Sequence, residues 1–169
     1  FDGLPEGYDH KYVYTHLGYN LKITDMQAAC GLAQLEKLEK FIKIRKNNFN
    51  YLYKKFKKLE EYFILPESLK ESDTSWFGFA LTLRKNIFFG RNELVRFLDK
   101  NKIDTRLLFA GNITKQPLMK NIEFKIHNSL LNTNEVMNNT FWMGVYPALQ
   151  KPHLDYMFDK VSEFIKSKK

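Results

Sequence analysis

Apolar residues recur every seven positions in the stretch that follows residue 24. The series comprises Leu35, Ile42, Phe49, Phe56 and Phe63, with Leu38, Leu52 and Leu59 in the interleaved positions. Side chains at these spacings lie on one side of an α-helix. Thr24 and Gln27 have the spacing of a capping box, which starts a helix. The pattern predicts one long helix with a continuous apolar stripe, interrupted by Arg45.

The length of this helix, predicted over residues 25–62, bears on how the chain is organised. About 35 helical residues would run about 50 Å at about 1.5 Å per residue, which is more than a compact domain of this size needs. We therefore expect the helix to connect two bodies. Residues 1–24 would form an extended lead-in, and residues 63–169 a small C-terminal α/β domain.

Strand-like and helix-like patterns alternate from residue 76 onward. Large apolar residues alternate with smaller ones in the first of these segments, which is the period of a strand. The strand candidates are residues 76–83, 103–109 and 141–146, and the helix candidates are residues 93–101, residues 133–139 and a last helix that Pro152 opens. This order predicts the α/β class, with an α+β-like small domain in which helices cover one face of a small mixed sheet.

The composition narrows the class of protein. Of the 169 residues 44% are hydrophobic, with 15 Phe and 9 Tyr, so the chain can bury a core and global disorder is excluded. No run approaches the roughly 18 apolar residues of a membrane span. Cys30 is the single cysteine, which excludes an internal disulfide and fits a reducing, cytoplasmic location. The chain begins at Phe1 without a signal peptide or an initiator Met, so we expect a piece of a longer protein.

The net charge of +8 raises the possibility of a nucleic-acid partner. Most of the excess lies between Glu36 and Lys58, where an amphipathic helix would carry lysines on its solvent side. A solvated helix face is therefore the favoured interpretation, and a basic nucleic-acid-binding module is the alternative from another class. The heptad stripe leaves a third interpretation, a dimerisation element.

Sharp catalytic and metal-binding motifs are missing from the sequence. It has no G-x-G-x-x-G, Walker loop, H-E-x-x-H, C-x-x-C or G-x-S-x-G pattern. His10 and His16 are six residues apart, which is not the spacing of helical metal ligands, so we predict no metal site. Cys30 lies among alanines and is interpreted as a small core residue. No catalytic residue is predicted within the chain.

Two polar stretches are candidates for binding. Residues 16–25 contain a glycine turn just before a helix start, where exposed N–H groups can hold a phosphate. Residues 105–117 run from a strand into a loop bearing Arg, Asn, Lys and Gln, a donor-rich rim suited to an anionic or sugar ligand. A plain capped helix and an ordinary exposed loop remain alternatives at these two places.

The same stretches resemble a known family. In proteins of that family a segment joins a large and a small domain. Two parts of this chain are similar to that segment, namely Tyr8-Asp9-His10-Lys11-Tyr12 and Gly18-Tyr19-Asn20-Leu21-Lys22-Ile23-Thr24-Asp25-Met26-Gln27-Ala28-Ala29. Further likeness lies in Arg106-x-x-Phe109-x-Gly111-Asn112-x-Thr114-x-Gln116-Pro117 and in Phe141-Trp142-x-Gly144-Val145-x-Pro147. These motifs occur in the same order as in the family and span essentially the whole chain. The chain therefore resembles sugar aminotransferases of the DegT/DnrJ/EryC1/StrS family, and in particular the CDP-4-keto-6-deoxyglucose 3-dehydrase branch of lipopolysaccharide O-antigen synthesis.

The resemblance implies a fold and a function. The chain would be the C-terminal domain of a fold-type-I pyridoxal phosphate (PLP) enzyme, with residues 1–24 leading in from a large domain outside it. The full-length protein would use pyridoxamine phosphate to remove the 3-hydroxyl of a CDP-sugar, or act as a sugar aminotransferase. Histidine as the upstream base implies dehydration, and lysine implies transamination. This chain alone would be inactive.

Cofactors, partners and site residues follow from the same resemblance. It implies a homodimer, an NADH-dependent reductase partner if the enzyme is a dehydrase, and an iron–sulfur cluster whose ligands lie outside this chain. It places Asn20 near the cofactor phosphate of the partner subunit. It also places Arg106, Gly111 and Asn112 over the nucleotide-sugar substrate.

Overall fold

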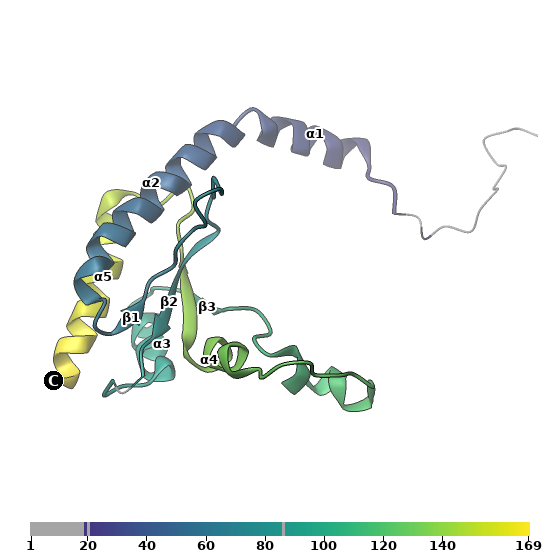
Figure 1. The fold of residues 1–169 in the computed structure, drawn as a ribbon. Coiled ribbons are helices and arrows are strands. Elements are labelled where there is room, and N and C mark those ends of the chain that lie inside the picture. Colours follow the sequence, from purple (N-terminus) through teal and green to yellow (C-terminus); the bar gives the residue numbers. More distant parts are fainter. Residues whose placement is uncertain (1–18, 20, 86) are drawn as a thin grey trace, which may run out of the picture. The chain divides into compact units, whose positions relative to one another are not determined.

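The computed structural model describes residues 19, 21–85 and 87–169 (Figure 1). The chain forms two compact units, residues 1–37 and residues 38–169. In the first, helix α1 covers Asp25–Leu35 and begins with the predicted capping box. The backbone N–H of Thr24 donates to Gln27 Oε1 at 2.9 Å, and the N–H of Gln27 donates to Thr24 Oγ1 at 3.3 Å. The lead-in predicted for residues 1–24 lies mostly outside the described residues.

The predicted long helix is divided into several elements. A turn at Glu36 and Lys37 separates α1 from α2 (Leu38–Phe56), and a 3-10 helix, η2, follows at Lys57–Leu59. The N–H of Lys37 donates to the carbonyl of Gln34 at 3.0 Å, a bond three residues back that tightens the chain where α1 ends. The compact units consequently divide between Lys37 and Leu38, inside the range predicted as one helix.

The apolar stripe is shorter than its heptad spacing predicts. Only the second half of α2 is buried, at Asn48, Phe49, Leu52 and Phe56. Leu35 is 63% exposed. Phe63 is buried, but it reaches the core from a strand and not from the helix.

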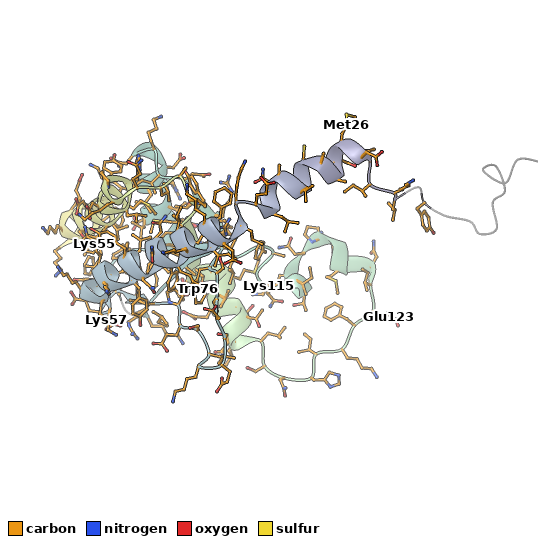
Figure 2. All side chains as sticks on the ribbon, turned by 90° about the horizontal axis from the view of Figure 1, so that it is seen from above. Met26, Lys55, Lys57, Trp76, Lys115 and Glu123 are labelled. Carbon is orange, nitrogen blue, oxygen red and sulfur yellow. The ribbon has the colours of Figure 1, made fainter. Side chains whose placement is uncertain are left out.

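Helix α1 has no buried residue, and its side chains project to solvent around the helix, as Figure 2 shows at Met26. Cys30 is exposed on it, so the interpretation of Cys30 as a core residue is wrong. The small residues around Cys30 left that interpretation open, because a small side chain suits close packing but does not require it.

Four strands form the sheet, in the order β1-β2-β4-β3. Their bounds are Phe63–Ile64 (β1), Gly78–Leu83 (β2), Thr105–Leu107 (β3) and Thr140–Gly144 (β4). Every neighbouring pair is antiparallel, so the expected mixed sheet is in fact antiparallel. The three predicted strands are present in shortened form. The sequence analysis missed β1, because two residues are too few to show alternation.

Three longer helices complete this unit. Their bounds are Arg91–Lys100 (α3), Leu131–Asn139 (α4) and Lys151–Lys168 (α5), and two 3-10 helices, η3 (Ile113–Lys115) and η4 (Pro117–Asn121), lie between β3 and α4. The predicted helices at residues 93–101, 133–139 and from Pro152 on are therefore present, and the predicted fold class is confirmed. The backbone N–H of Gly90 donates to Glu93 Oε2 at 3.2 Å at the start of α3, and this bond lowers the pKa of the Glu93 carboxyl.

The core lies between one face of the sheet and helices α2, α3 and α5 (Figure 1). Phe79, Leu81 and Leu83 alternate along β2 into this core, as the period of a strand requires. Phe56 of α2 has no exposed surface, and its ring centroid lies 5.2 Å from that of Phe79 and 5.3 Å from that of Phe158. Among the described helices, none is long and apolar enough to cross a membrane.

Three lysines of the basic segment, which spans α2 and the start of η2, are neutralised by nearby carboxylates. Lys46, Lys55 and Lys57 each form an ion pair with a carboxylate of the same unit, and Figure 2 shows Lys55 and Lys57 near the end of α2. These pairs reduce the charge that this part of α2 offers to a polyanion. They favour the solvated-face interpretation of the segment over a nucleic-acid site.

Asp155 joins α2 to α5. Its carboxylate accepts hydrogen bonds from Lys55 and Tyr51 of α2 and from Lys151 Nζ, at 2.9 Å, on its own helix. The Lys55 ammonium, followed by the Tyr51 hydroxyl and Lys151, lowers the pKa of Asp155 well below its usual range. The Asp155 carboxylate, followed by the Tyr51 hydroxyl, raises the pKa of Lys151.

Asp155→Asn is expected to destabilise the chain near neutral pH and to change its response to acid. A lowered pKa in the folded state stabilises the fold above the unfolded-state pKa of about 3.9. This stabilisation by ionised Asp155 decreases as the pH falls from the unfolded-state pKa to the folded-state pKa. Urea unfolding midpoints of wild type and variant should therefore differ at pH 7 and converge as pH falls below about 4. Asp159→Asn, on an exposed part of the same helix, is the control. A constant difference between wild type and Asp155→Asn at all pH values would contradict the expectation.

Candidate functional site

The predicted binding stretch, residues 105–117, leaves the sheet at the end of β3. Phe109 and Gly111 have φ angles of 49° and 61°, in the left-handed region that only glycine adopts freely. The N–H of Phe109 donates to the carbonyl of Leu107 at 2.7 Å, and the N–H of Gly111 donates to that of Leu108 at 3.1 Å. Two left-handed residues so close together turn the chain sharply and leave the Phe109 ring 79% exposed.

Asn112 is buried in this loop and holds it together. The residue is 2% exposed and caps η3. Its Oδ1 accepts from the backbone N–H of Thr114 at 3.0 Å and from the Thr114 hydroxyl at 2.7 Å. Its Nδ2 donates to Asn134 Oδ1 of α4 at 2.8 Å. The Asn112 side chain is therefore engaged within the protein, where it positions the loop against α4.

Gly111 makes a second contact between the loop and α4. A Cβ atom at this position would lie 2.6 Å from Cγ and 2.7 Å from Cβ of Met137. The close approach and the positive φ together require glycine here. Gly111 thus sets the path of the backbone, and it has no side chain to offer a ligand.

Arg106 is the predicted site residue with a polar group directed to solvent. Its side chain is 62% exposed, and its Nη1 donates to Asp104 Oδ1 at 2.6 Å and to the carbonyl of Thr105 at 3.1 Å. One carboxylate engages Nη1, so the other guanidinium N–H groups can still bind an anion. Of the three residues predicted over the substrate, Arg106 has an exposed polar side chain, Asn112 is buried and Gly111 has no side chain.

The predicted cofactor residue, Asn20, lies outside the described residues. Elsewhere in the described ranges, no three His, Cys, Asp or Glu side chains gather as metal ligands would.

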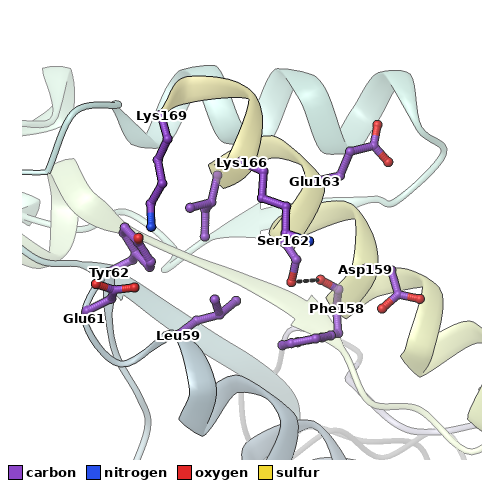
Figure 3. Close-up of a pocket in the computed structure, with 10 residues that line it drawn as sticks. Leu59, Glu61, Tyr62, Phe158, Asp159, Ser162, Glu163, Lys166 and Lys169 are labelled. Carbon is purple, nitrogen blue, oxygen red and sulfur yellow. Dashed lines mark hydrogen bonds between the residues drawn. The ribbon is translucent and has the colours of Figure 1, made fainter.

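A pocket of about 600 Å³ lies elsewhere in the unit, between the end of η2 and helix α5 (Figure 3). Leu59, Tyr62 and Phe158 form part of its apolar lining. The Ser162 hydroxyl points to the carbonyl of Phe158 and donates to it at 2.9 Å, so it is not free as a nucleophile. Lys169 hydrogen-bonds to Tyr62, which raises the pKa of Lys169. The residues predicted over the substrate do not line this pocket.

Comparison with protein families gives the context for the loop. The model of the DegT/DnrJ/EryC1/StrS aminotransferase family matches residues 2–162. The chain belongs to this family. The match covers nearly all of the chain, so the resemblance stated from the motifs is confirmed at the level of the family.

Curated relatives include sugar 3-dehydratases of the same family. The chain is 56% identical over 161 residues to the lipopolysaccharide biosynthesis protein RfbH of Salmonella typhimurium, covering 95% of this chain and 37% of that protein. It is 44% identical over 162 residues to dTDP-4-dehydro-2,6-dideoxy-D-glucose 3-dehydratase of Saccharopolyspora spinosa, and this match covers 96% of this chain and 35% of that protein. The chain thus spans a little over a third of the length of these relatives.

Solved structures share the fold. Escherichia coli GDP-4-keto-6-deoxy-D-mannose-3-dehydratase with bound hydrated PLP superposes with a TM-score of 0.83 at 27% identity, covering 92% of this chain and 40% of that one. A variant of this enzyme bound to GDP-perosamine gives the same TM-score, identity and coverage. The DesV structure of S. venezuelae, at 22% identity and a TM-score of 0.79, covers 95% of this chain and 41% of that chain and supports the fold alone.

Proposed function

We propose that this chain is the C-terminal domain of a PLP- or pyridoxamine-phosphate-dependent enzyme that removes the 3-hydroxyl from a nucleotide-linked 4-keto-6-deoxysugar. The observation that carries the proposal is the ranking of the relatives. RfbH and the dTDP-sugar 3-dehydratase are 56% and 44% identical, whereas the GDP-perosamine synthases of Escherichia coli O157:H7 and Vibrio cholerae are 27% and 32% identical. Similarity is thus greater to RfbH and to this 3-dehydratase than to these synthases, while the GDP-sugar 3-dehydratases, at 28%, are as distant as the synthases.

The finer assignment is CDP-4-keto-6-deoxyglucose as substrate in O-antigen synthesis. It rests on the motif resemblance, since the relatives' names specify dTDP- and GDP-sugars and leave the nucleotide open. A homodimer, a cytoplasmic location and an NADH-dependent reductase belong to the same proposal. The iron–sulfur cluster does not, because no relative's name supports it and its ligands would lie outside this chain.

Each predicted site residue has a distinct role in this proposal. A bound pyridoxamine phosphate supplies an electron sink that lets a proton be removed and the neighbouring hydroxyl leave. Arg106 binds the anionic part of the substrate through its exposed guanidinium. Asn112 and Gly111 hold the backbone that carries this strand end against α4. Asn20 contacts the cofactor phosphate near the start of α1, where backbone N–H groups favour an anion.

A sugar aminotransferase of the same family is the second candidate. The family name and the GDP-perosamine synthases among the relatives favour it. The two reactions differ in the base that lies outside this chain, since lysine carries out transamination and histidine carries out dehydration.

A hybrid enzyme tests the proposal. This chain replaces the matching segment of Salmonella RfbH and is loaded with pyridoxamine phosphate. In a single turnover without reductase, we expect CDP-4-keto-6-deoxyglucose to lose one water, measured by mass spectrometry, and the dTDP- and GDP-linked analogues to lose less. Asn20→Ala should lose bound cofactor on dialysis, whereas Asn50→Ala, an exposed asparagine of α2, should retain it. A folded, loaded hybrid that dehydrates none of the three substrates would contradict the proposal.

A further inference from the structure

The sheet has a second face, opposite the helices α2, α3 and α5, and Trp142 occupies its centre. In the antiparallel register Trp142 of β4 pairs with Ala80 of β2 and with Arg106 of β3. Residues paired in this way point to the same side of a sheet. Trp142 and Arg106 are therefore neighbours on the face that does not form the core.

The indole of Trp142 is fixed across three strands. A Cβ atom on Gly78 would lie 2.3 Å from Cε3 of Trp142, so the ring rests directly on the bare backbone of β2. At its other end, Nε1 donates to the carbonyl of Leu107 at the end of β3, at 3.1 Å. A glycine under one edge and a hydrogen bond at the other hold the indole as a platform on the sheet.

The Phe77 ring and the Arg106 side chain lie next to this platform, and Arg45 contacts the Phe77 ring. The Phe77 ring lies 4.9 Å from the Trp142 ring between centroids, at 58°, and Phe77 is 61% exposed. The Arg45 guanidinium of α2 lies 5.9 Å from the Phe77 centroid. Arg106, 62% exposed, flanks Trp142 from β3. We call Arg45, Phe77, Trp142 and Arg106 the aromatic–guanidinium row.

We infer that the aromatic–guanidinium row binds the nucleoside diphosphate part of a nucleotide-sugar. This inference rests on the proposed function and adds the residues that recognise the nucleotide. Exposed aromatic rings stack a nucleobase of any kind, because every base has a π-face. Guanidinium groups bind diphosphate oxygens through paired N–H donors. The base stacks on Trp142 with the inclined Phe77 ring against its edge, and Arg106 binds the diphosphate.

Charge and shape both favour this occupant over an apolar partner. The row carries two guanidinium groups, and the carboxylate that pairs with Arg106 is Asp104. A flat ring that bears a dianion complements such a row. An apolar protein surface would bury these two guanidinium groups without acceptors for their remaining N–H donors, which is costly.

The test follows the two tryptophan side chains of the complete 169-residue chain by ¹H–¹⁵N NMR, with CDP, dTDP or GDP as probe. Nucleotide addition should move the Nε1–H signal of Trp142. That of Trp76 should stay, because its ring is stacked on Phe49 with centroids 4.5 Å apart. Trp142→Phe assigns the two signals. Inorganic pyrophosphate should move the Arg106 side-chain signal and leave Trp142 unchanged.

Substitutions measure how much the row contributes. Trp142→Leu should weaken the nucleotide about tenfold or more, the loss of one stacked base. Arg106→Gln should weaken both the nucleotide and pyrophosphate, whereas Arg96→Gln, an exposed arginine of α3, should weaken neither. Gly78→Ala keeps all four side chains but lifts the indole, so it should lower affinity in a chain whose circular dichroism is unchanged.

Several outcomes would overturn the inference. The first is that wild type and Trp142→Leu bind the nucleotide with equal affinity. The second is that pyrophosphate moves the Trp142 signal as much as the nucleotide does. The third is that no nucleotide moves this signal up to about 10 mM, a concentration that corresponds to a binding free energy near −3 kcal/mol. In the RfbH hybrid, Trp142→Leu should raise KM more than it lowers kcat. An unchanged KM would also overturn the inference, because it would mean that the rest of the enzyme covers the row and keeps the nucleotide from it. If the hybrid dehydrates its substrate while the Trp142 signal does not respond to nucleotides, the inference fails and the proposed function stands. If Trp142 binds nucleotides but the hybrid is inactive, the proposed function fails.

Discussion

Phe56→Ala is expected to lower the free energy of unfolding by about 3–5 kcal/mol, the usual cost of removing a fully buried phenylalanine. Phe56 has no exposed surface, and its ring meets those of Phe63, Phe79 and Phe158, which come from β1, β2 and α5. The substitution leaves a cavity where these elements meet, and rigid strands on one side limit its collapse. Urea denaturation followed by circular dichroism measures the loss.

Leu35→Ala is the matched control for this prediction. Leu35 belongs to the same heptad series but is 63% exposed on α1. Its replacement should change stability by less than about 0.5 kcal/mol, as for most surface positions. A loss below about 1 kcal/mol for Phe56→Ala would show that the ring is not buried as described.

Gly111→Ala is expected to cost about 1–2 kcal/mol for the left-handed backbone and about 1–3 kcal/mol more for the overlap with Met137. The φ angle of 61° disfavours a Cβ atom, and the new atom would lie 2.6 Å from Met137 Cγ. Thermal unfolding and urea titration both measure this loss.

Gly111→Asn separates the two contributions. Asparagine tolerates the left-handed region better than alanine does, yet its Cβ atom meets the same methionine. We therefore expect a smaller loss than for alanine, though still a loss. Wild-type stability in both variants would mean that the loop does not pack on α4 through Gly111.

The helices and strands of residues 76–169 were largely predictable, because their periods are local. The period of two in residues 78–83 reports burial on one side of β2, and the capping pair at Thr24 and Gln27 marks the start of α1. The sheet order was not predictable, since nothing in the sequence of Thr140–Gly144 says that this strand lies between β2 and β3.

The long apolar stripe was overestimated for a physical reason. A seven-residue spacing is compatible with a helix, but it does not show that each position has a partner to pack against. Leu35 and Phe63 fit the series equally well, yet one is exposed on α1 and the other is buried on β1. Tertiary packing decided between them, and periodicity carries no information about it.

The motif resemblance singled out Arg106, Gly111 and Asn112, and the structure shows how each of them is placed. The Arg106 side chain is 62% exposed. Asn112 looked equally functional by residue type, but its partner Asn134 is 22 residues away, a pairing visible only in the fold. The sequence shows that Trp142 and Gly78 are present, but it does not show that they touch. Their contact depends on the register of β2 against β4.

The position of β4 has a consequence for synthesis on the ribosome. β4 is the last strand in the sequence but is hydrogen-bonded to both β2 and β3, which do not pair with each other. A nascent polypeptide that stops before residue 140 therefore has at most the β1–β2 hairpin, with β2 open along one edge. Such an edge invites pairing between chains. Premature termination anywhere upstream of Thr140 should thus yield a product prone to aggregate, whereas loss of the exposed residues 166–169 should be tolerated.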